Sequence, residues 1–387
     1  MVKAIKVMLI PNNVQKTKMF QYAGASRFAY NWALAREIEN YEKGGKFISD
    51  AELRKEFTKL RHSDEYAWLL SISNNVTKQA IKDACTAYKN FFKGLQKFPR
   101  FKSKKRSMPK FYQDNVKIRF SNTHVKFEGF SSSRKANKQK MNWVRLAEHG
   151  RIPTDVKYMN PRISFDGLNW WISVCVEFPD CIEKLNDDGI GIDLGIKDLA
   201  ICSDGAKYKN INKSQKVKKL EKQKRRLQRS ISRSYEKNKK GESYCKTNNV
   251  IKKEKLLLKR NHRLTNIRKN YLNQTISEIV NRKPRFICIE DLNVSGMMKN
   301  RHLSKAVQEQ GFFGFRKQLE YKCSDKGIQL IVADRFYPSS KLCSCCGNIK
   351  KDLKLSDRVY RCECGNMIDR DFQASINLKA YGERFAS

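Results

Sequence analysis

The sequence predicts an α+β protein with several domains, and three observations support this prediction. The chain has 387 residues, of which 40% are apolar, so it is long enough for two or three domains with their own cores. The apolar spacing changes from a strand period of two to a helical period and back again along the first half of the chain. In the second half, two apolar strands each end in a carboxylate. We therefore expect three domains, made of residues 1–13 with 109–185, residues 14–108, and residues 186–387.

The charge of the chain predicts a polyanionic partner. Lys and Arg number 80 against 39 acids, a formal charge of +41, which is more than solubility requires. Nucleic acid is favoured over a membrane surface, because no apolar run approaches the roughly 20 residues of a spanning helix and no signal peptide opens the chain. The twelve cysteines are either scattered or set in close pairs of metal-ligand type. This distribution is not that of a disulfide framework, so it favours a reducing compartment. We therefore expect a cytoplasmic or nucleoid protein.

The first domain is predicted to be a small antiparallel β-barrel or sheet. Residues 1–10 alternate apolar side chains with lysines, and Pro11 ends this strand. A period of two returns at residue 111, and Asp166-Gly167 predicts a hairpin turn. A single strand cannot stand alone, so the first strand is expected to complete the later sheet. Residues 14–108 would then be an insertion between its first and second strands.

The inserted region is predicted to be helical over roughly 14–42 and 74–96, with a capping box from Ser49 to Glu52. Its apolar stripes most simply form a core, and Lys78 and Gln79 are candidate nucleic-acid contacts on a polar face. Residues 98–106 interleave aromatic with basic residues, including Arg100 and Lys102. This composition suits phosphate neutralisation with base stacking, and it suits a solvated linker equally well.

The third domain is organised around Asp193. This acid follows Ile190 and Ile192, and Leu199–Ile201 resume an apolar strand before the Asp204-Gly205 turn, which predicts a hairpin. Gly195 is expected to let another backbone approach closely. A carboxylate among apolar strand residues is costly unless it is neutralised.

Two further acids are expected to join Asp193. Glu290 ends a second apolar strand at 285–293, and Asp371 lies on a predicted helix for which Asp369 is the expected N-cap. Three separated carboxylates that converge at strand ends are the ligand set that divalent metals use in phosphodiester chemistry.

Residues 207–282 are predicted to form a basic helical hairpin between these strands. Residues 207–269 carry 24 Lys or Arg against four Glu, a net charge of +20. Helices are expected near 214–234 and 250–281, with a break at Gly241. Self-repulsion of this size is tolerable mainly when phosphates neutralise it, so nucleic-acid contact is favoured over a solvated face. The candidate contacts are Lys224, Arg225, Arg226 and Arg229.

The last part of the chain carries a cysteine signature after a predicted helix at 303–321 and a strand at 328–333. Cys343, Cys346, Cys362 and Cys364 lie in residues 340–367 as two close pairs, each followed by a glycine. Such pairs can bring four thiolates around one structural zinc, which leaves no open position for catalysis. Cys345 is then spare. The alternative is a set of free buried thiols.

Several of these segments together resemble the TnpB proteins of insertion sequences, which are related to type V CRISPR effectors. The resemblance runs over nearly the whole chain, and its motifs are Tyr30-Asn-Trp-Ala33, Pro99-Arg-Phe-Lys102, Gly191-Ile-Asp-Leu-Gly195, Ile289-Glu-Asp-Leu-Asn293, Phe336-Tyr-Pro-Ser-Ser-Lys341 and Cys364-Gly-Asn-Met-Ile-Asp-Arg-Asp371. It implies a wedge-type β-barrel, an inserted helical recognition lobe, and an RNase H-like (RuvC) nuclease domain with a zinc-ribbon insertion. One departure is Gln373, which stands where the family commonly has Asn.

The resemblance implies an RNA-guided DNA endonuclease. Asp193, Glu290 and Asp371 would hold two Mg²⁺ ions, a guide RNA would specify a double-stranded DNA target, and the protein would read a short flanking motif. Two other functions stay open. A guided repressor that does not cut would be expected to have lost at least one acid, and a DDE-like transposase would join strands. The sequence leaves the oligomeric state, monomer or dimer, undecided.

Overall fold

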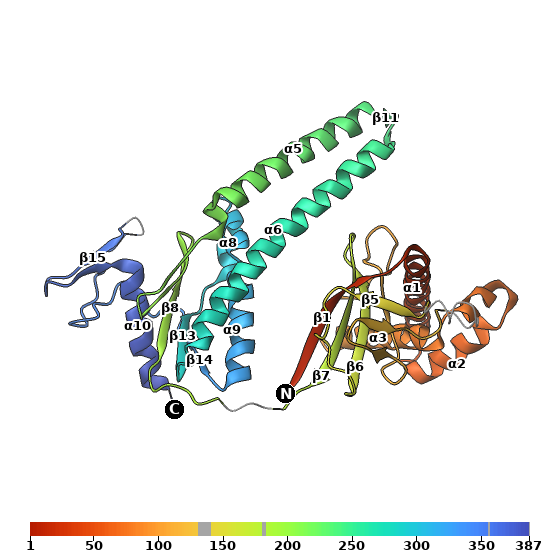
Figure 1. Ribbon diagram of the computed structural model, residues 1–387, viewed down its shortest axis with the longest axis horizontal. Coiled ribbons are helices and arrows are strands. Elements are labelled where there is room, and N and C mark those ends of the chain that lie inside the picture. The colour runs from red at the N-terminus through yellow and green to blue at the C-terminus, as the bar shows by residue number, and fades with distance from the viewer. Residues whose placement is uncertain (131–140, 180–182, 355–356, 387) are drawn as a thin grey trace. The chain divides into compact units, whose positions relative to one another are not determined.

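A computed structural model of the chain divides into two compact units, Met1–Pro179 and Asp180–Ser387 (Figure 1). The structure describes residues 1–130, 141–179, 183–354 and 357–386. Parts of two predicted regions therefore lie outside the described residues: 131–140 and 180–182 of the first domain, and 355–356 of the cysteine-bearing insertion. No helix among the described residues is both long and apolar enough to cross a membrane.

A seven-stranded antiparallel sheet forms the base of the first unit. Its order is β2-β6-β7-β1-β5-β4-β3, so the amino-terminal strand lies in the middle of the sheet. The strands are β1 (Val2–Ile10), β2 (Lys110–Tyr112), β3 (Arg119–Phe120), β4 (His124–Lys126), β5 (Trp143–Leu146), β6 (Tyr158–Phe165) and β7 (Trp170–Glu177). The two outermost strands, β2 and β3, have three and two residues, and no pairing joins them among the described residues. Over the ranges that the structure describes, the predicted antiparallel strands therefore form a sheet with two open edges, and no closed barrel is found there.

Helices follow β1 and precede β2 in the chain, and they share one apolar core with the sheet. They are α1 (Asn13–Glu42), α2 (Asp50–Arg61), the short 3-10 helix η1 (Asp64–Ser71) and α3 (Asn74–Phe92). The capping box is confirmed at α2: Glu52 N donates to Ser49 Oγ at 3.2 Å, and Ser49 N donates to the Glu52 carboxylate at 2.9 Å. α3 ends at Phe92, before the predicted residue 96, because Gly94 turns the chain with a positive φ of 70°.

A five-stranded mixed sheet organises the second unit, in the order β10-β9-β8-β13-β14. Its strands are β8 (Ile190–Leu194), β9 (Asp198–Cys202), β10 (Lys207–Lys209), β13 (Phe286–Glu290) and β14 (Gln329–Ala333). β8, β13 and β14 run parallel, whereas β9 and β10 are antiparallel. The predicted hairpin around the Asp204-Gly205 turn is therefore present.

Helices cover both faces of this sheet. α6 (Asn248–Asn281) and α9 (Phe312–Lys326) pack on one face through a shared apolar core, and α10 (Arg370–Phe385) packs on the other. The predicted single helix at 303–321 is wrong. Gly311 adopts a positive φ of 72° and divides the segment into α8 (Ser304–Gln310) and α9, which follow the short helix α7 (Val294–Lys299).

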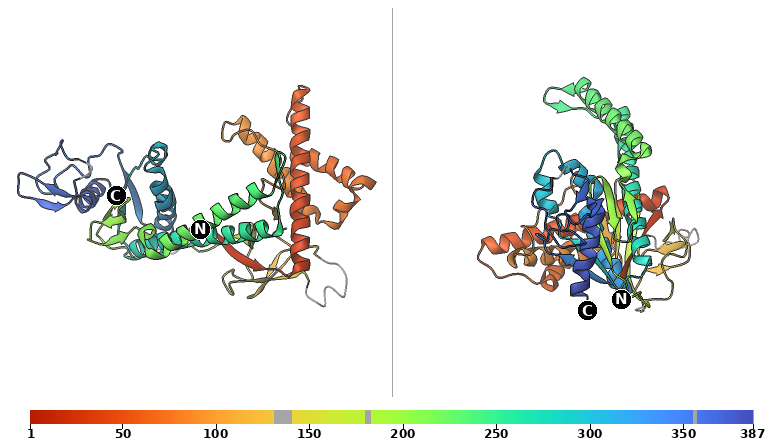
Figure 2. Two further views of the ribbon diagram at one scale, coloured as in Figure 1. Left: turned by 90° about the horizontal axis from the view of Figure 1, so that it is seen from above. Right: turned by 90° about the vertical axis from the view of Figure 1, so that its left-hand side faces the viewer.

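The basic hairpin consists of two long helices, α5 (Gln215–Lys237) and α6, which lie side by side (Figure 2). Short strands β11 (Lys239–Lys240) and β12 (Ser243–Tyr244) form its tip, and η2 (Ile211–Lys213) leads into it. Near the base, Val217 and Leu220 of α5 pack on Leu264 of α6. Along most of α5 the side chains stay in solvent. Strands β15 (Val359–Arg361) and β16 (Met367–Asp369) carry the second cysteine pair between them.

Candidate active site and four-cysteine cluster

Asp193 and Glu290 lie next to each other at the ends of two parallel strands. The last registered pair between β8 and β13 is Ile192 with Ile289, and the two acids are the next residue on each strand. Side chains alternate between the faces of a strand, so both acids share a face with Gly191 and Cys288. This is the face that α10 covers.

The closer approach of a backbone occurs at Gly191, and a second, less tight one occurs at Gly195, as the sequence suggested. A Cβ atom at Gly191 would overlap the backbone O of Ser375 and the backbone N of Lys379, both in α10. At Gly195 the nearest atom to such a Cβ is Asp198 O, at 3.1 Å. Gly191 therefore lets α10 lie directly on β8, which brings the first turn of the helix toward Asp193.

Asp369 and Asp371 have different positions at the start of α10. The Asp369 carboxylate accepts hydrogen bonds from the backbone N–H groups of Asp371 and Phe372, both at 3.1 Å, so its predicted N-cap geometry is confirmed. Asp371 lies inside the first turn, where Arg370 donates to its Oδ1 from Nε at 3.2 Å and from Nη2 at 3.0 Å. The other side of this turn is buried, with Ala374 and Ser375 at 1% and 0% exposure.

Electrostatic interactions link Asp193, Glu290 and Asp371. Burial raises the pKa of Asp193 well above its usual range, and the negative charges of Glu290 and Asp371 raise it further. Burial also raises the pKa of Glu290, which the hydrogen bond from Ser339 opposes and Asp371 reinforces. A divalent cation would offset both burial and repulsion, so the donor set fits such an ion.

Ser339 is a partner of the site that the sequence analysis missed. Its hydroxyl donates to Glu290 Oε1, and its backbone carbonyl accepts from Asn377 Nδ2 at 2.7 Å. Ser339 is 4% exposed and Asn377 is 2% exposed. A chain of buried hydrogen bonds thus joins the acid on β13 to the middle of α10. The only sequence signal for it is the Ser-Ser pair within residues 336–341.

Four thiols converge in the predicted cysteine insertion. The sulfur atoms of Cys343, Cys346, Cys362 and Cys364 all lie within 4.8 Å of one another, and within the described ranges no other group of three or more Cys, His, Asp or Glu ligands is this compact. The three acids are therefore spread more widely than the thiols. Cys345 is exposed and stands outside the cluster. Although burial opposes it, hydrogen bonds from the Cys346 N–H and from the Asn366 side chain lower the pKa of Cys343 to about 6. Four sulfur atoms this close together suit the ligand set of one zinc ion.

Gln373 connects the cysteine cluster to the helix that carries Asp371. It is fully buried, and its Nε2 donates to the Leu342 carbonyl at 2.7 Å. Its Oε1 accepts from Ser344 at 2.9 Å and from Asn366 at 3.3 Å. Asn366 also donates to the Cys343 sulfur at 3.4 Å. The glutamine thus makes three hydrogen bonds to the two cysteine loops.

The predicted contacts on α5 line a basic hollow at the base of the hairpin. Arg225, Arg226 and Arg229 are exposed and border a pocket of about 620 Å³. Lys224 is half-buried, with its ammonium 3.9 Å from Glu221. Arg268 of α6 also meets Glu221, at 3.1 Å, which fixes the two helices together. The exposed guanidinium groups are placed to meet an anion.

The predicted contacts in the first unit differ in accessibility. Arg100 is exposed and Lys78 is half-buried. Gln79 donates to Asp83 at 2.9 Å, and the Lys102 ammonium lies 3.0 Å from the centre of the Tyr30 ring. Burial lowers the pKa of Lys102 to about 7. Gln79 and Lys102 thus already have partners within the protein, which the linear sequence does not reveal.

The chain matches known protein families and named relatives. Three protein-family models match the chain: a helix-turn-helix domain over residues 1–46, a probable transposase over 173–301, and a Cas12f1-like TNB domain over 312–378. The chain is 30% identical over 400 residues to the "Putative RNA-guided DNA endonuclease InsQ" of Escherichia coli (strain K12), a match that covers 98% of this chain and 92% of that protein. It is 29% identical over 382 residues to a protein of Streptomyces pristinaespiralis named "Putative RNA-guided DNA endonuclease", covering 98% and 89%.

A solved structure shares the fold. The cryo-EM structure of a Cas12f1-sgRNA-target DNA complex contains a chain that matches with a TM-score of 0.59 and 12% identity, over 98% of both chains. The helix-turn-helix family model matches residues 1–46, and in the structure these residues contain β1 and the single long helix α1.

Proposed function

Because this chain belongs to the TnpB family of transposon-encoded proteins related to Cas12 effectors, we propose that it is an RNA-guided DNA endonuclease. The observation that carries this proposal is the meeting of two strand-end carboxylates with the first turn of α10. Asp193 and Glu290 are adjacent on parallel strands, and both are raised in pKa by burial and by mutual repulsion that includes Asp371. Protein sites gather buried carboxylates in this way mainly where a cation binds.

We assign the catalytic role to Asp193, Glu290 and Asp371, which would hold two Mg²⁺ ions. Metal ions held there would supply Lewis-acid chemistry, namely activation of a water and stabilisation of the leaving oxygen of a phosphodiester. The chain itself orients the ligands: Ser339 fixes the Glu290 carboxylate, Asp369 sets the start of α10, and Gly191 seats that helix on β8. In this account the second unit is an RNase H-like (RuvC) nuclease domain, and the four thiols hold one structural zinc.

The remaining surface would bind nucleic acid. The +20 charge of residues 207–269 lies largely on α5 and α6, where Arg225, Arg226 and Arg229 are exposed. A guide RNA and its duplex with target DNA are the polyanions that the proposed function supplies. In this account the first unit contains the wedge sheet and the helical recognition region.

The test is reconstitution with the RNA that copurifies when the protein is expressed with its native flanking DNA. The complex should cut double-stranded DNA that carries the matching target beside a randomised flank, only when Mg²⁺ is present. Sequencing the cut products would identify the flanking motif. Target binding without any cut would indicate a guided repressor, and joined strand ends would indicate a transposase.

A further inference from the structure

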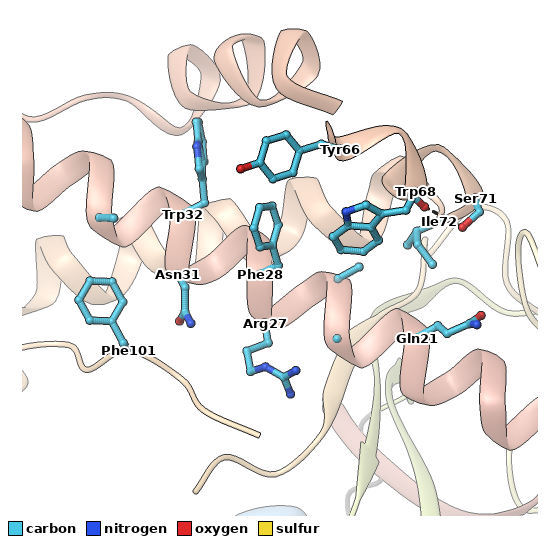
Figure 3. A pocket seen from close by; sticks show the side chains of 13 residues that line it. Gln21, Arg27, Phe28, Asn31, Trp32, Tyr66, Trp68, Ser71, Ile72 and Phe101 are labelled. Carbon is cyan, nitrogen blue, oxygen red and sulfur yellow. Dashed lines mark hydrogen bonds between the residues drawn. The ribbon is translucent and has the colours of Figure 1, made fainter. Parts of the chain in front are cut away.

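An aromatic pocket of about 780 Å³ lies in the helical part of the first unit, and none of the three acids or the four clustered cysteines lines it (Figure 3). It is formed by one side of α1, by η1 with the residue after it, and by the segment 98–106. Its volume falls within the range of about 300–1,000 Å³ that is typical of small-ligand sites. The lining residues are Gln21, Gly24, Ala25, Arg27, Phe28, Asn31, Trp32, Ala35, Tyr66, Trp68, Ser71, Ile72 and Phe101.

Five aromatic rings line this pocket, and two of them are exposed at its mouth. Phe28 stacks on Tyr66 with a centroid distance of 5.5 Å and an interplanar angle of 30°, and it meets Trp68 edge-on at 5.7 Å. Trp68 is 48% exposed, and Phe101 is 57% exposed. Large flat rings around an open hollow provide stacking faces for a flat aromatic ligand.

The polar groups around the rings favour an anionic ligand. The lining includes the Arg27 guanidinium and no carboxylate. Phe101 belongs to the segment 98–106, which has five Lys or Arg and no acid. Asn31 holds this segment against α1 through two hydrogen bonds of 2.8 Å with the backbone N–H and C=O of Lys102. The basic segment is therefore fixed at the edge of the aromatic pocket.

We propose that this pocket binds an unpaired nucleotide of a single-stranded nucleic acid. The base would stack on an exposed ring of the pocket, Trp68 or Phe101, and Arg27 with the cations of 98–106 would neutralise adjacent phosphates. The inference rests on the proposed function, because an RNA-guided endonuclease meets two single-stranded nucleic acids. One is an unpaired loop of the guide RNA, and the other is the displaced DNA strand. Stacking chemistry is common to both.

The test measures binding of short oligonucleotides to the full-length chain by fluorescence anisotropy. Phe101→Ala is the main variant because Phe101 is exposed, and Trp68→Ala is the second. Either substitution should weaken binding of a single-stranded probe about 10-fold. Phe101→Tyr, which keeps a ring, should restore binding. Phe385→Ala, at a residue that is 58% exposed at the end of α10 in the other unit, is the matched control and should bind as the unaltered chain does.

An abasic probe separates stacking from charge. It has the same phosphates and no bases, so the unaltered chain should bind it more weakly than the base-containing probe, and Phe101→Ala should bind the two nearly alike. Parallel RNA and DNA probes identify the source: tighter binding of RNA indicates the guide, and tighter binding of DNA indicates the displaced strand.

Two outcomes would overturn the inference. One is equal binding of both probes by Phe101→Ala, Trp68→Ala and the unaltered chain. The other is a variant, Phe101→Ala or Trp68→Ala, that binds the oligonucleotide as the unaltered chain does but has a different sedimentation coefficient. A changed oligomeric state would mean that the pocket holds a side chain of a second copy of the protein. Guided cleavage by the unaltered complex is scored separately, so loss of the inference with cleavage intact is distinct from failure of the proposed function.

Discussion

The two aspartates that flank Arg370 are the sharpest contrast at the scale of single residues. Asp371→Ala should abolish DNA cleavage while guide and target binding stay near those of the unaltered protein, because this side chain belongs to the carboxylate group that includes Asp193. Asp369→Ala should lower the free energy of unfolding by about 0.5–2 kcal/mol and leave appreciable cleavage, because it removes an N-cap. Cleavage assays and denaturant unfolding check the pair. The reverse pattern, with Asp371→Ala cutting and Asp369→Ala inactive, would contradict the assignment.

The buried carboxylate of Asp193 should reduce stability when no metal is bound. Its pKa is raised by burial and then by Glu290, so the native state holds a proton that the unfolded chain releases. Stability contributed by such a group falls as pH rises from the usual aspartate pKa toward the raised one. Asp193→Asn should therefore raise the melting temperature of the metal-free protein at about pH 8, with a smaller gain at about pH 5.

Magnesium supplies the control for this variant. Millimolar Mg²⁺ should raise the melting temperature of the unaltered chain and have much less effect on Asp193→Asn, because a ligand that binds the native state stabilises it by mass action. Equal melting temperatures for the two proteins without metal, at both pH values, would show that the buried Asp193 carboxylate does not reduce the stability of the metal-free protein.

At the scale of elements, Gln373 joins α10 to both cysteine loops. Gln373→Ala leaves the Ser344 hydroxyl and the Asn366 amide without this acceptor, which should cost about 1–3 kcal/mol of stability. Zinc should be lost to a chelator faster than from the unaltered protein, and cleavage should fall because the first turn of α10 is less firmly held. Gln308→Ala, at an exposed position of α8, is the control.

Asparagine, the residue that the TnpB family commonly has at position 373, provides a second variant for this test. Gln373→Asn keeps the amide on a shorter side chain, so zinc retention and cleavage should recover in part relative to Gln373→Ala. Zinc retention and cleavage that are identical in all three proteins would show that this bridge does not support the site.

The basic face of α5 is the second element with a measurable role. Changing Lys224, Arg225, Arg226 and Arg229 to Gln should flatten the slope of log affinity for RNA against log salt by about 0.7–0.9 for each phosphate that the protein no longer neutralises. Replacing the exposed lysines Lys46, Lys55, Lys59 and Lys93 by Gln removes the same charge from the other unit and should change the slope less. An unchanged slope after the α5 substitutions would mean that this face is only solvated.

The elements also show what the sequence can predict. The strands that carry Asp193 and Glu290, the N-cap at Asp369 and the two helices of the hairpin follow from local periodicity and capping, and the structure contains each of them. The break at Gly311 was missed because Leu303 and Val307 before it and Phe312 and Phe315 after it continue an apolar pattern across it. The open edges of the first sheet depend on pairing between distant strands, which no local pattern encodes.

In the candidate active site, the sequence predicted the three charged residues but not the neutral residues that hold them in place. A carboxylate at a strand end is conspicuous because it is costly to bury, so three acids can be proposed from sequence. Ser339 and Asn377 carry no such signal, because a serine or an asparagine is unremarkable until its partner is known. Gln79 and Lys102 stay predicted nucleic-acid contacts, and each also has a partner within the protein that no local pattern reveals: Gln79 donates to Asp83, and the Lys102 ammonium lies over the Tyr30 ring.

At the scale of the whole molecule, the positive charge is shared between the two units. Residues 1–179 carry 34 Lys or Arg against 15 acids, a net charge of +19, and residues 180–387 carry 46 against 24, a net charge of +22. Each unit therefore repels itself, and each would gain from a polyanion. The pairing of a large positive charge with compact apolar cores indicates a protein whose native state is most stable when phosphates are bound.

This leads to a prediction in which salt has opposite effects on stability and on binding. Raising the salt concentration from about 0.1 M to about 0.5 M shortens the screening length, so it weakens self-repulsion and phosphate contacts alike. The melting temperature of the protein freed of nucleic acid should therefore rise, by at least about 2 °C, while its affinity for RNA falls. The melting temperature of the variant with the four α5 cations replaced should rise less with salt, because less charge repulsion remains to be screened. A melting temperature that falls with salt in the RNA-free protein would mean that favourable ion pairs, such as those of Arg268 with Glu221 and Glu309, outweigh the repulsion among the 80 cations.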